Sequence, residues 1–130
     1  MIPQFDESGC LPPGIHPATL DEVEAYFGQL SELRRVQIDS IRWMVELARR
    51  AGAERIVLNG SFVTDIIEPN DVDCVMLVEP RNRRNRKAVA QLRKGLPFLD
   101  LAMVRAEVFD EYVHEVFAAD LLCRKPAHAS

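Results

Sequence analysis

Two carboxylates inside an apolar segment constrain this chain more than any other feature. Asp71 and Asp73 flank Val72 in the run Asp-Val-Asp-Cys-Val, which follows a Pro-Asn turn. Because side chains on a strand alternate between faces, both aspartates point to one face, roughly 6–7 Å apart, and Val72 and Cys74 point to the other. A charged group in such a run is costly to desolvate unless it is paired or bound to a metal. The pair therefore predicts a strand with one functional face.

Two other short segments extend the pattern. Gly60 and Ser61 lie just after residues 55–58 (RIVL), which are expected to form a short buried strand, and Asp100 stands in the apolar run Phe-Leu-Asp-Leu-Ala-Met. Gly60 lets the backbone come close to a phosphate group because it has no side chain. Ser61 offers a hydroxyl group, and a helix beginning there would point N–H groups at an anion. Each feature taken alone is ordinary turn chemistry, so the inference rests on their combination.

Together these residues resemble the nucleotidyltransferase superfamily of the DNA polymerase β type. The motif of that superfamily reads apolar-Gly-(Gly/Ser), a spacer and Asp-apolar-(Asp/Glu), with a third acid on a later strand. The resemblance implies that Asp71, Asp73 and Asp100 are catalytic and bind Mg²⁺, or Mn²⁺ in its place. It also implies that Asp100 helps to activate the nucleophile, and that Gly60 and Ser61 bind the β- and γ-phosphates of an NTP. Such transfer depends mainly on positioning and charge neutralisation.

The N-terminal sequence LPPGIHPATLDEV, residues 11–23, is similar to the opening of a group of short bacterial proteins that carry this core. The size resembles the minimal nucleotidyltransferases, which often act with a second small protein from an adjacent gene. In some bacterial toxin–antitoxin modules such an enzyme adenylylates its toxin partner. In others the enzyme is itself the toxin and modifies transfer RNA. The resemblance therefore leaves a protein acceptor and an RNA acceptor open.

The order of apolar and polar segments predicts an α/β fold of the α+β type, with a short mixed sheet of three or more strands flanked by helices. Residues 1–17 hold four of the eight prolines and predict an extended arm. A single domain is expected over residues 18–124, followed by a frayed tail at 125–130. The expected helices are 20–27, 31 to about 50, 86–94 and 108–122, and the expected strands are 55–58, 72–78 and 97–104.

The composition is that of an ordinary globular domain, with 48% hydrophobic residues, 28% charged residues and a formal net charge of −4. No segment predicts a membrane span or a signal peptide, so a cytoplasmic protein without a membrane partner is expected. The three cysteines show neither zinc-type spacing nor a disulfide framework. Nothing in the overall charge predicts a protein that coats nucleic acid.

One strongly basic run, residues 81–87 (RNRRNRK), carries five positive charges. It could bind a triphosphate or an RNA acceptor near the acids, or it could be a solvated loop, and it contains no aromatic residue to stack on bases. Three functions therefore compete. The first is a Mg²⁺-dependent nucleotidyltransferase, the second is a catalytically silent antitoxin or adaptor that binds a partner protein through its N-terminal arm, and the third is an RNA binder without chemistry.

Overall fold

A five-stranded mixed sheet forms the centre of the computed structural model, which describes residues 2–5, 7, 9–12, 14–113 and 117–120. The strand order is β1-β5-β2-β3-β4. β2 runs antiparallel to both of its neighbours, whereas β1 pairs with β5, and β3 with β4, in parallel. The fold is therefore of the α+β type. The strands are β1 Gly14–Pro17, β2 Arg55–Asn59, β3 Val72–Leu77, β4 Leu99–Val104 and β5 Phe117–Asp120.

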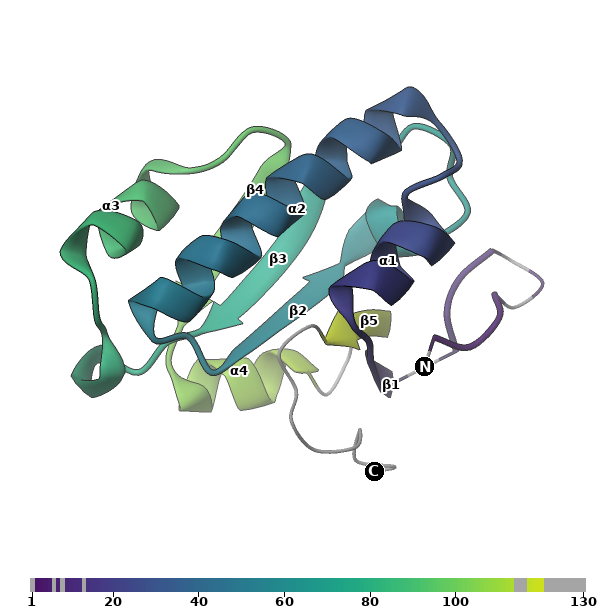
Figure 1. The fold of residues 1–130 in the computed structure, drawn as a ribbon. Helices are drawn as coiled ribbons and strands as arrows, with labels where there is room; N and C mark the ends of the chain where they lie inside the picture. Colours follow the sequence, from purple (N-terminus) through teal and green to yellow (C-terminus); the bar gives the residue numbers. More distant parts are fainter. Residues whose placement is uncertain (1, 6, 8, 13, 114–116, 121–130) are drawn as a thin grey trace.

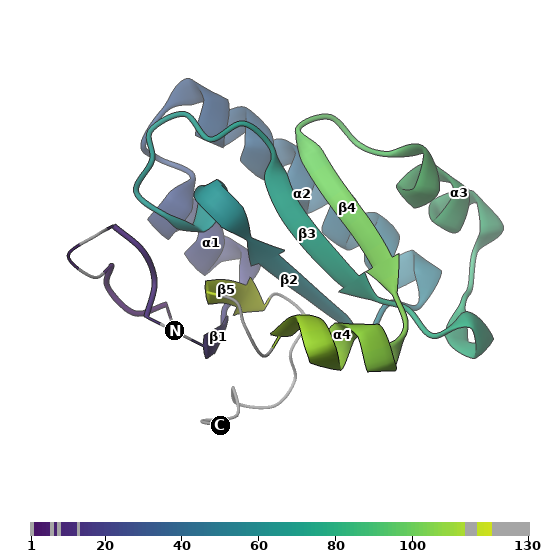
Figure 2. The same cartoon turned by 180° about the vertical axis from the view of Figure 1, so that it is seen from behind.

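Helices cover the two faces of the sheet unequally (Figure 1). Three helices lie on one face, with the long helix α2 between α1 and α3, and α4 lies on the other face (Figure 2). Two single turns of 3₁₀ helix, η1 and η2, follow β2 and β3. The helix bounds are α1 Leu20–Phe27, α2 Glu32–Ala51, α3 Arg86–Lys94 and α4 Ala106–Val113, and those of the 3₁₀ turns are η1 Gly60–Val63 and η2 Pro80–Asn82.

Local capping chemistry sets the helix ends near the predicted positions. Thr19 and Glu22 form a reciprocal capping box at the start of α1, and the Ser31 side chain accepts a hydrogen bond from the backbone N–H of Arg34 in α2. Such caps satisfy N–H groups that have no partner within the helix. Gly52 ends α2 in the left-handed conformation, which glycine adopts without steric cost.

The C-terminal region differs from the prediction. Residues 108–122 do not form one helix, because α4 ends at Val113 and Phe117–Asp120 form β5. β5 lies between β1 and β2 and pairs with both, so it supplies backbone partners to an edge of β2 that would otherwise be open. Residues 121 and 122, like the predicted tail at 125–130, lie outside the described residues.

The N-terminal segment packs against the rest of the chain. Its last residues form β1 within the sheet, and Ile2 and Leu11 are buried in the main core. The Phe5 ring meets the Tyr26 ring edge-on, with the centroids 5.2 Å apart. The predicted boundary between arm and domain at residue 18 therefore does not separate two structural units. Among the described residues, no helix is long and apolar enough to cross a membrane.

Alternation along β3 separates two cores. Val72, Cys74 and Met76 face the main core beneath the three helices. Val75 and Leu77 point to the opposite face and form a smaller cluster with Phe109 of α4. Asp73 shares this second face by the same alternation, so the fold places its carboxyl group on the side of the sheet that carries a single helix.

Candidate active site

Two of the predicted acids lie side by side on neighbouring strands. Asp73 of β3 is in register with Asp100 of β4, and Asn59 of β2 is in register with Asp73. Neighbouring strands are about 4.8 Å apart, and residues in register point to the same face. The three side chains therefore form one polar row across the sheet. The sequence did not single out Asn59, whose Nδ2 donates a hydrogen bond of 3.0 Å to the Tyr112 hydroxyl of α4.

The two acids of the polar row lie beyond the part of the sheet that α4 covers, whereas Asn59 contacts Tyr112 of α4. In Figure 2, α4 crosses the sheet where β3 and β4 end, while the residues that begin these strands lie away from it. Exposure follows this arrangement, because Val75 and Leu77 are buried, Asp73 is half-buried and Asp100 is exposed. A ligand can therefore approach both carboxyl groups from solvent.

Gly60 lies directly against the Asp73 carboxyl group. Its φ angle is +75°, and a Cβ atom at this position would be 2.1 Å from Asp73 Oδ2. Only glycine fits such a site without strain or displacement of the neighbour. η1 begins at Gly60 and includes Ser61, so the Gly-Ser turn and the acid strand meet at this point.

The carboxylates influence one another electrostatically. Partial burial raises the pKa of Asp73 above its ordinary value, and the nearby charges of Asp100 and Asp71 raise it further. Asp71 is exposed and lies one residue before β3. A raised pKa means that the ionised form of Asp73 is disfavoured in the folded chain. The carboxyl groups of Asp73, Asp100 and Asp71 therefore repel one another when they are ionised.

The chemistry of these residues fits a divalent cation, although their side chains are not gathered around one point. Within the described part of the chain, no group of three His, Cys, Asp or Glu side chains is placed to hold a metal ion. Asp73 and Asp100 share one end and one face of the sheet, and Mg²⁺ typically binds through one or two carboxylates together with phosphate oxygens. A bound cation would also reverse the effect that raises the pKa of Asp73.

A buried arginine holds the loop between the Gly-Ser turn and the acids. Arg34 of α2 is fully buried, and it donates hydrogen bonds to the backbone carbonyls of Phe62 at 2.7 Å and Thr64 at 2.8 Å. Burial lowers the pKa of Arg34 and the charge of Asp65 raises it, but an arginine stays protonated in proteins. The guanidinium group therefore fixes the backbone that follows Gly60.

Gln37, one turn further along α2, holds the second half of the same loop. Its Nε2 donates to the carbonyls of Pro69 and Asn70, both at 3.0 Å. Neither Arg34 nor Gln37 was recognised in the sequence. Their spacing could have indicated that they are buried, because both lie on the helical stripe that also carries the buried Ile38.

The basic run does not lie beside the acids. Asp71 and Asp73 are at the start of β3, whereas residues 81–87 follow its end. A strand of this length separates the two groups by roughly 15–20 Å. Of the interpretations of the run, direct contact with a triphosphate held by the acids is therefore not supported by its position.

Comparison of the sequence with known protein families identifies the family of this chain. Residues 3–127 match the description "Family of unknown function (DUF6932)", so the protein belongs to the DUF6932 family. No curated protein matches the chain, and no solved structure matches it.

Proposed function

We propose that the protein is a Mg²⁺-dependent nucleotidyltransferase that moves a nucleoside monophosphate from an NTP to a hydroxyl group of protein or RNA. The observation that carries the proposal is the register of Asp73 with Asp100, together with the packing of Gly60 against the Asp73 carboxyl group. A structural turn has no need for two carboxylates in one row beside a glycine backbone. These are the parts that phosphoryl-group chemistry requires.

Each residue has one role in the proposed reaction. Asp71, Asp73 and Asp100 would hold Mg²⁺, or Mn²⁺ in its place, which would neutralise the phosphate charges when bound. Gly60 and Ser61 would place the β- and γ-phosphates against the backbone of η1. Arg34 and Gln37 are positioning residues, since they hold the loop between these two groups.

The proposed transfer forms one bond and breaks one. The acceptor hydroxyl oxygen bonds to the α-phosphorus of the NTP, and the bond from that phosphorus to the bridging oxygen breaks. Pyrophosphate leaves, and the hydroxyl proton passes to the Asp100 carboxylate. Asp100 is suited to this step because it is the more exposed carboxyl group of the register pair, so an acceptor can reach it.

The silent antitoxin or adaptor is the second candidate, and the packing of the N-terminal segment bears on it. That candidate was expected to bind its partner through residues 1–17. Ile2 and Leu11 are instead buried in the chain's own core, so these two apolar side chains are not available to a partner. We therefore favour the enzyme over the adaptor. We propose that it acts in the cytoplasm, within a module of the toxin–antitoxin type, together with a partner chain from an adjacent gene.

Label transfer tests the proposal. The protein is incubated with NTPs labelled at the α-phosphate, Mg²⁺ or Mn²⁺, and protein and RNA fractions from the host cell. Labelling by the wild type that is lost in Asp73→Asn is expected, with Asp110→Asn, an exposed aspartate of α4, as the matched control. Equal labelling by wild type and Asp73→Asn, or no labelling from any NTP by a folded sample, would contradict the proposal.

A further inference from the structure

Seven arginines and lysines without any acid occupy one continuous segment of an acidic protein. Residues 80–99 contain seven of the sixteen basic residues and none of the twenty acidic ones, although the formal net charge of the chain is −4. The structure gathers part of this charge around a pocket of about 380 Å³ at the start of α3. The residues that line the pocket are Arg83, Arg84, Asn85, Arg86, Val89, Ala90 and Arg93.

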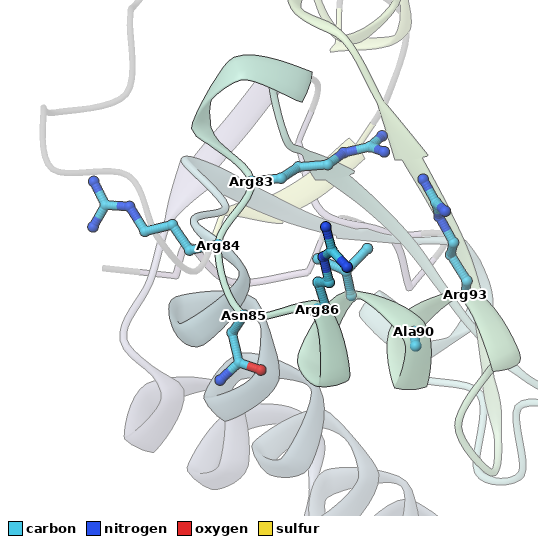
Figure 3. Close-up of a pocket in the computed structure, with 7 residues that line it drawn as sticks. Arg83, Arg84, Asn85, Arg86, Ala90 and Arg93 are labelled. Carbon is cyan, nitrogen blue, oxygen red and sulfur yellow. The ribbon is translucent and has the colours of Figure 1, made fainter.

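Three guanidinium groups face the same space. Figure 3 shows Arg83 reaching across the pocket towards Arg86 and Arg93 of α3, whereas Arg84 points away. Among the described residues, ion pairs are formed by Arg42 and Arg50, which lie outside the pocket. No described carboxylate lies within ion-pairing distance of Arg83, Arg86 or Arg93. Like charges held together without a counter-ion repel one another. The pocket therefore favours an anionic ligand.

The backbone around the pocket is held in place by several contacts. The N–H of Arg84 donates to the Ala51 carbonyl at 3.0 Å, and Asn82 Nδ2 donates to Glu54 Oε1 at 2.7 Å. Asn85 adopts a positive φ of 54° and caps α3 by accepting a hydrogen bond from the N–H of Ala88. The loop is thus joined to the end of α2 and to the start of α3, so the arginines extend from a fixed framework.

The chemistry of the surface distinguishes between anionic ligands. Planar guanidinium groups bind phosphate oxygens in pairs, and the exposed Arg81, Lys87 and Lys94 extend the positive surface beyond the pocket. A ligand longer than a single nucleotide would use this extension. Protein partners require apolar contact area, and none of the large hydrophobic residues exposed in the described chain lies between residues 81 and 94. Nucleic acid interfaces are more polar and more positively charged than protein interfaces.

We propose that the pocket formed by Arg83, Arg86 and Arg93 binds the phosphate backbone of a single RNA strand. The choice of RNA over other polyanions rests on the proposed transfer reaction, which needs an acceptor hydroxyl group. RNA carries such hydroxyl groups along its whole length. A ligand anchored here lies roughly 15–20 Å from the acids along β3. A nucleotide bound in the pocket could not reach them, whereas a strand of RNA can span that distance. No aromatic side chain lines the pocket, so it offers no ring on which a base could stack.

Fluorescence anisotropy with a short, mixed-sequence RNA tests the proposal without NTP or divalent metal. The triple change Arg83→Gln, Arg86→Gln and Arg93→Gln should weaken binding roughly tenfold or more and lower the slope of log affinity against log salt by about 2, since each phosphate contact contributes about 0.7. The control is Arg35→Gln, Arg49→Gln and Arg105→Gln, which removes equal charge from exposed arginines outside the pocket lining. Circular dichroism confirms that both variants fold.

The proposal would be overturned if the wild type did not bind RNA, or if the two triple variants lost equal affinity for RNA. Equally tight binding of polyglutamate would assign the pocket to acidic protein, and equally tight binding of the same sequence as DNA would remove the choice of RNA. Asp73→Asn should bind RNA as the wild type does, so a failure of nucleotidyl transfer and a failure of RNA binding are separable.

Discussion

The two ends of β3 carry opposite charge and are built in different ways. At its start, Asp73 and Asp100 are placed by strand register, and the sheet itself sets their spacing. At its end, Arg83 and Arg86 depend on a loop that Asn85 turns into α3 with a positive φ. Register follows from alternation along strands, whereas such a turn depends on one unusual backbone conformation. A sequence pattern can therefore predict the register of the acids, and it can locate the basic run, but it cannot predict the turn that gathers the arginines around one pocket.

The largest expected effect is at the acid end. Asp73→Asn preserves the shape of the side chain but removes the charge that would hold the metal, so label transfer should fall by roughly a thousandfold. Asp110→Asn should leave transfer unchanged. Transfer is measured as label incorporated per minute from α-phosphate-labelled NTP. Retained transfer in Asp73→Asn would remove the functional contrast between the two ends.

Arg34→Met should lower the stability of the protein, because the loop at the acid end depends on this buried arginine. The change leaves the carbonyls of Phe62 and Thr64 without their buried donor, and the free energy of unfolding should fall by about 3 kcal/mol. Arg35→Met, at the exposed neighbouring position, should change it by no more than about 0.5 kcal/mol. Urea unfolding provides both values, and similar losses would show that the loop does not need Arg34.

Gly60→Ala tests the contact between the Gly-Ser turn and the acids. The new Cβ would be 2.1 Å from Asp73 Oδ2 on a residue with positive φ, so a stability loss of about 1–2 kcal/mol is expected, together with weaker transfer. Gly95→Ala is the matched control, because Gly95 also has a positive φ but nothing lies within 4 Å of its Cβ position. Equal loss of transfer in the two variants would mean that the collision with Asp73 has no functional consequence.

The smallest effect concerns pH. Because the pKa of Asp73 is raised in the folded protein, the folded state binds the additional proton. Without divalent metal, stability should therefore decrease as pH rises through the interval between the ordinary aspartate pKa of about 3.9 and the raised value. The urea midpoint of Asp73→Asn should lack this component and exceed that of the wild type at neutral pH. Identical pH profiles for the two proteins would show that ionisation of Asp73 does not destabilise the folded state.

Much of the fold and the acid site could be predicted from the sequence, and the reasons are local. Thr19 and Ser31 are strong helix caps, and the alternation around Asp73 is a direct consequence of strand geometry. The role of Arg34 was less visible, since a charged residue on an apolar helical stripe indicates burial without naming its partners.

Other features depended on contacts between distant residues. β5 forms because Phe117–Asp120 find backbone partners in β1 and β2, and local helix propensity does not report such pairing. The arginine pocket likewise requires Arg93 to be brought beside Arg83 by the turn at Asn85.

Binding of Mn²⁺, followed by the electron paramagnetic resonance signal of the free ion, directly tests whether Asp73 and Asp100 form a cation site beside the Gly-Ser turn. The wild type and Asp110→Asn should bind the ion in the presence of an NTP analogue that cannot be transferred, and Asp73→Asn and Asp100→Asn should each lose this binding. Undiminished binding of Mn²⁺ by both of these variants would contradict a cation site at these two acids.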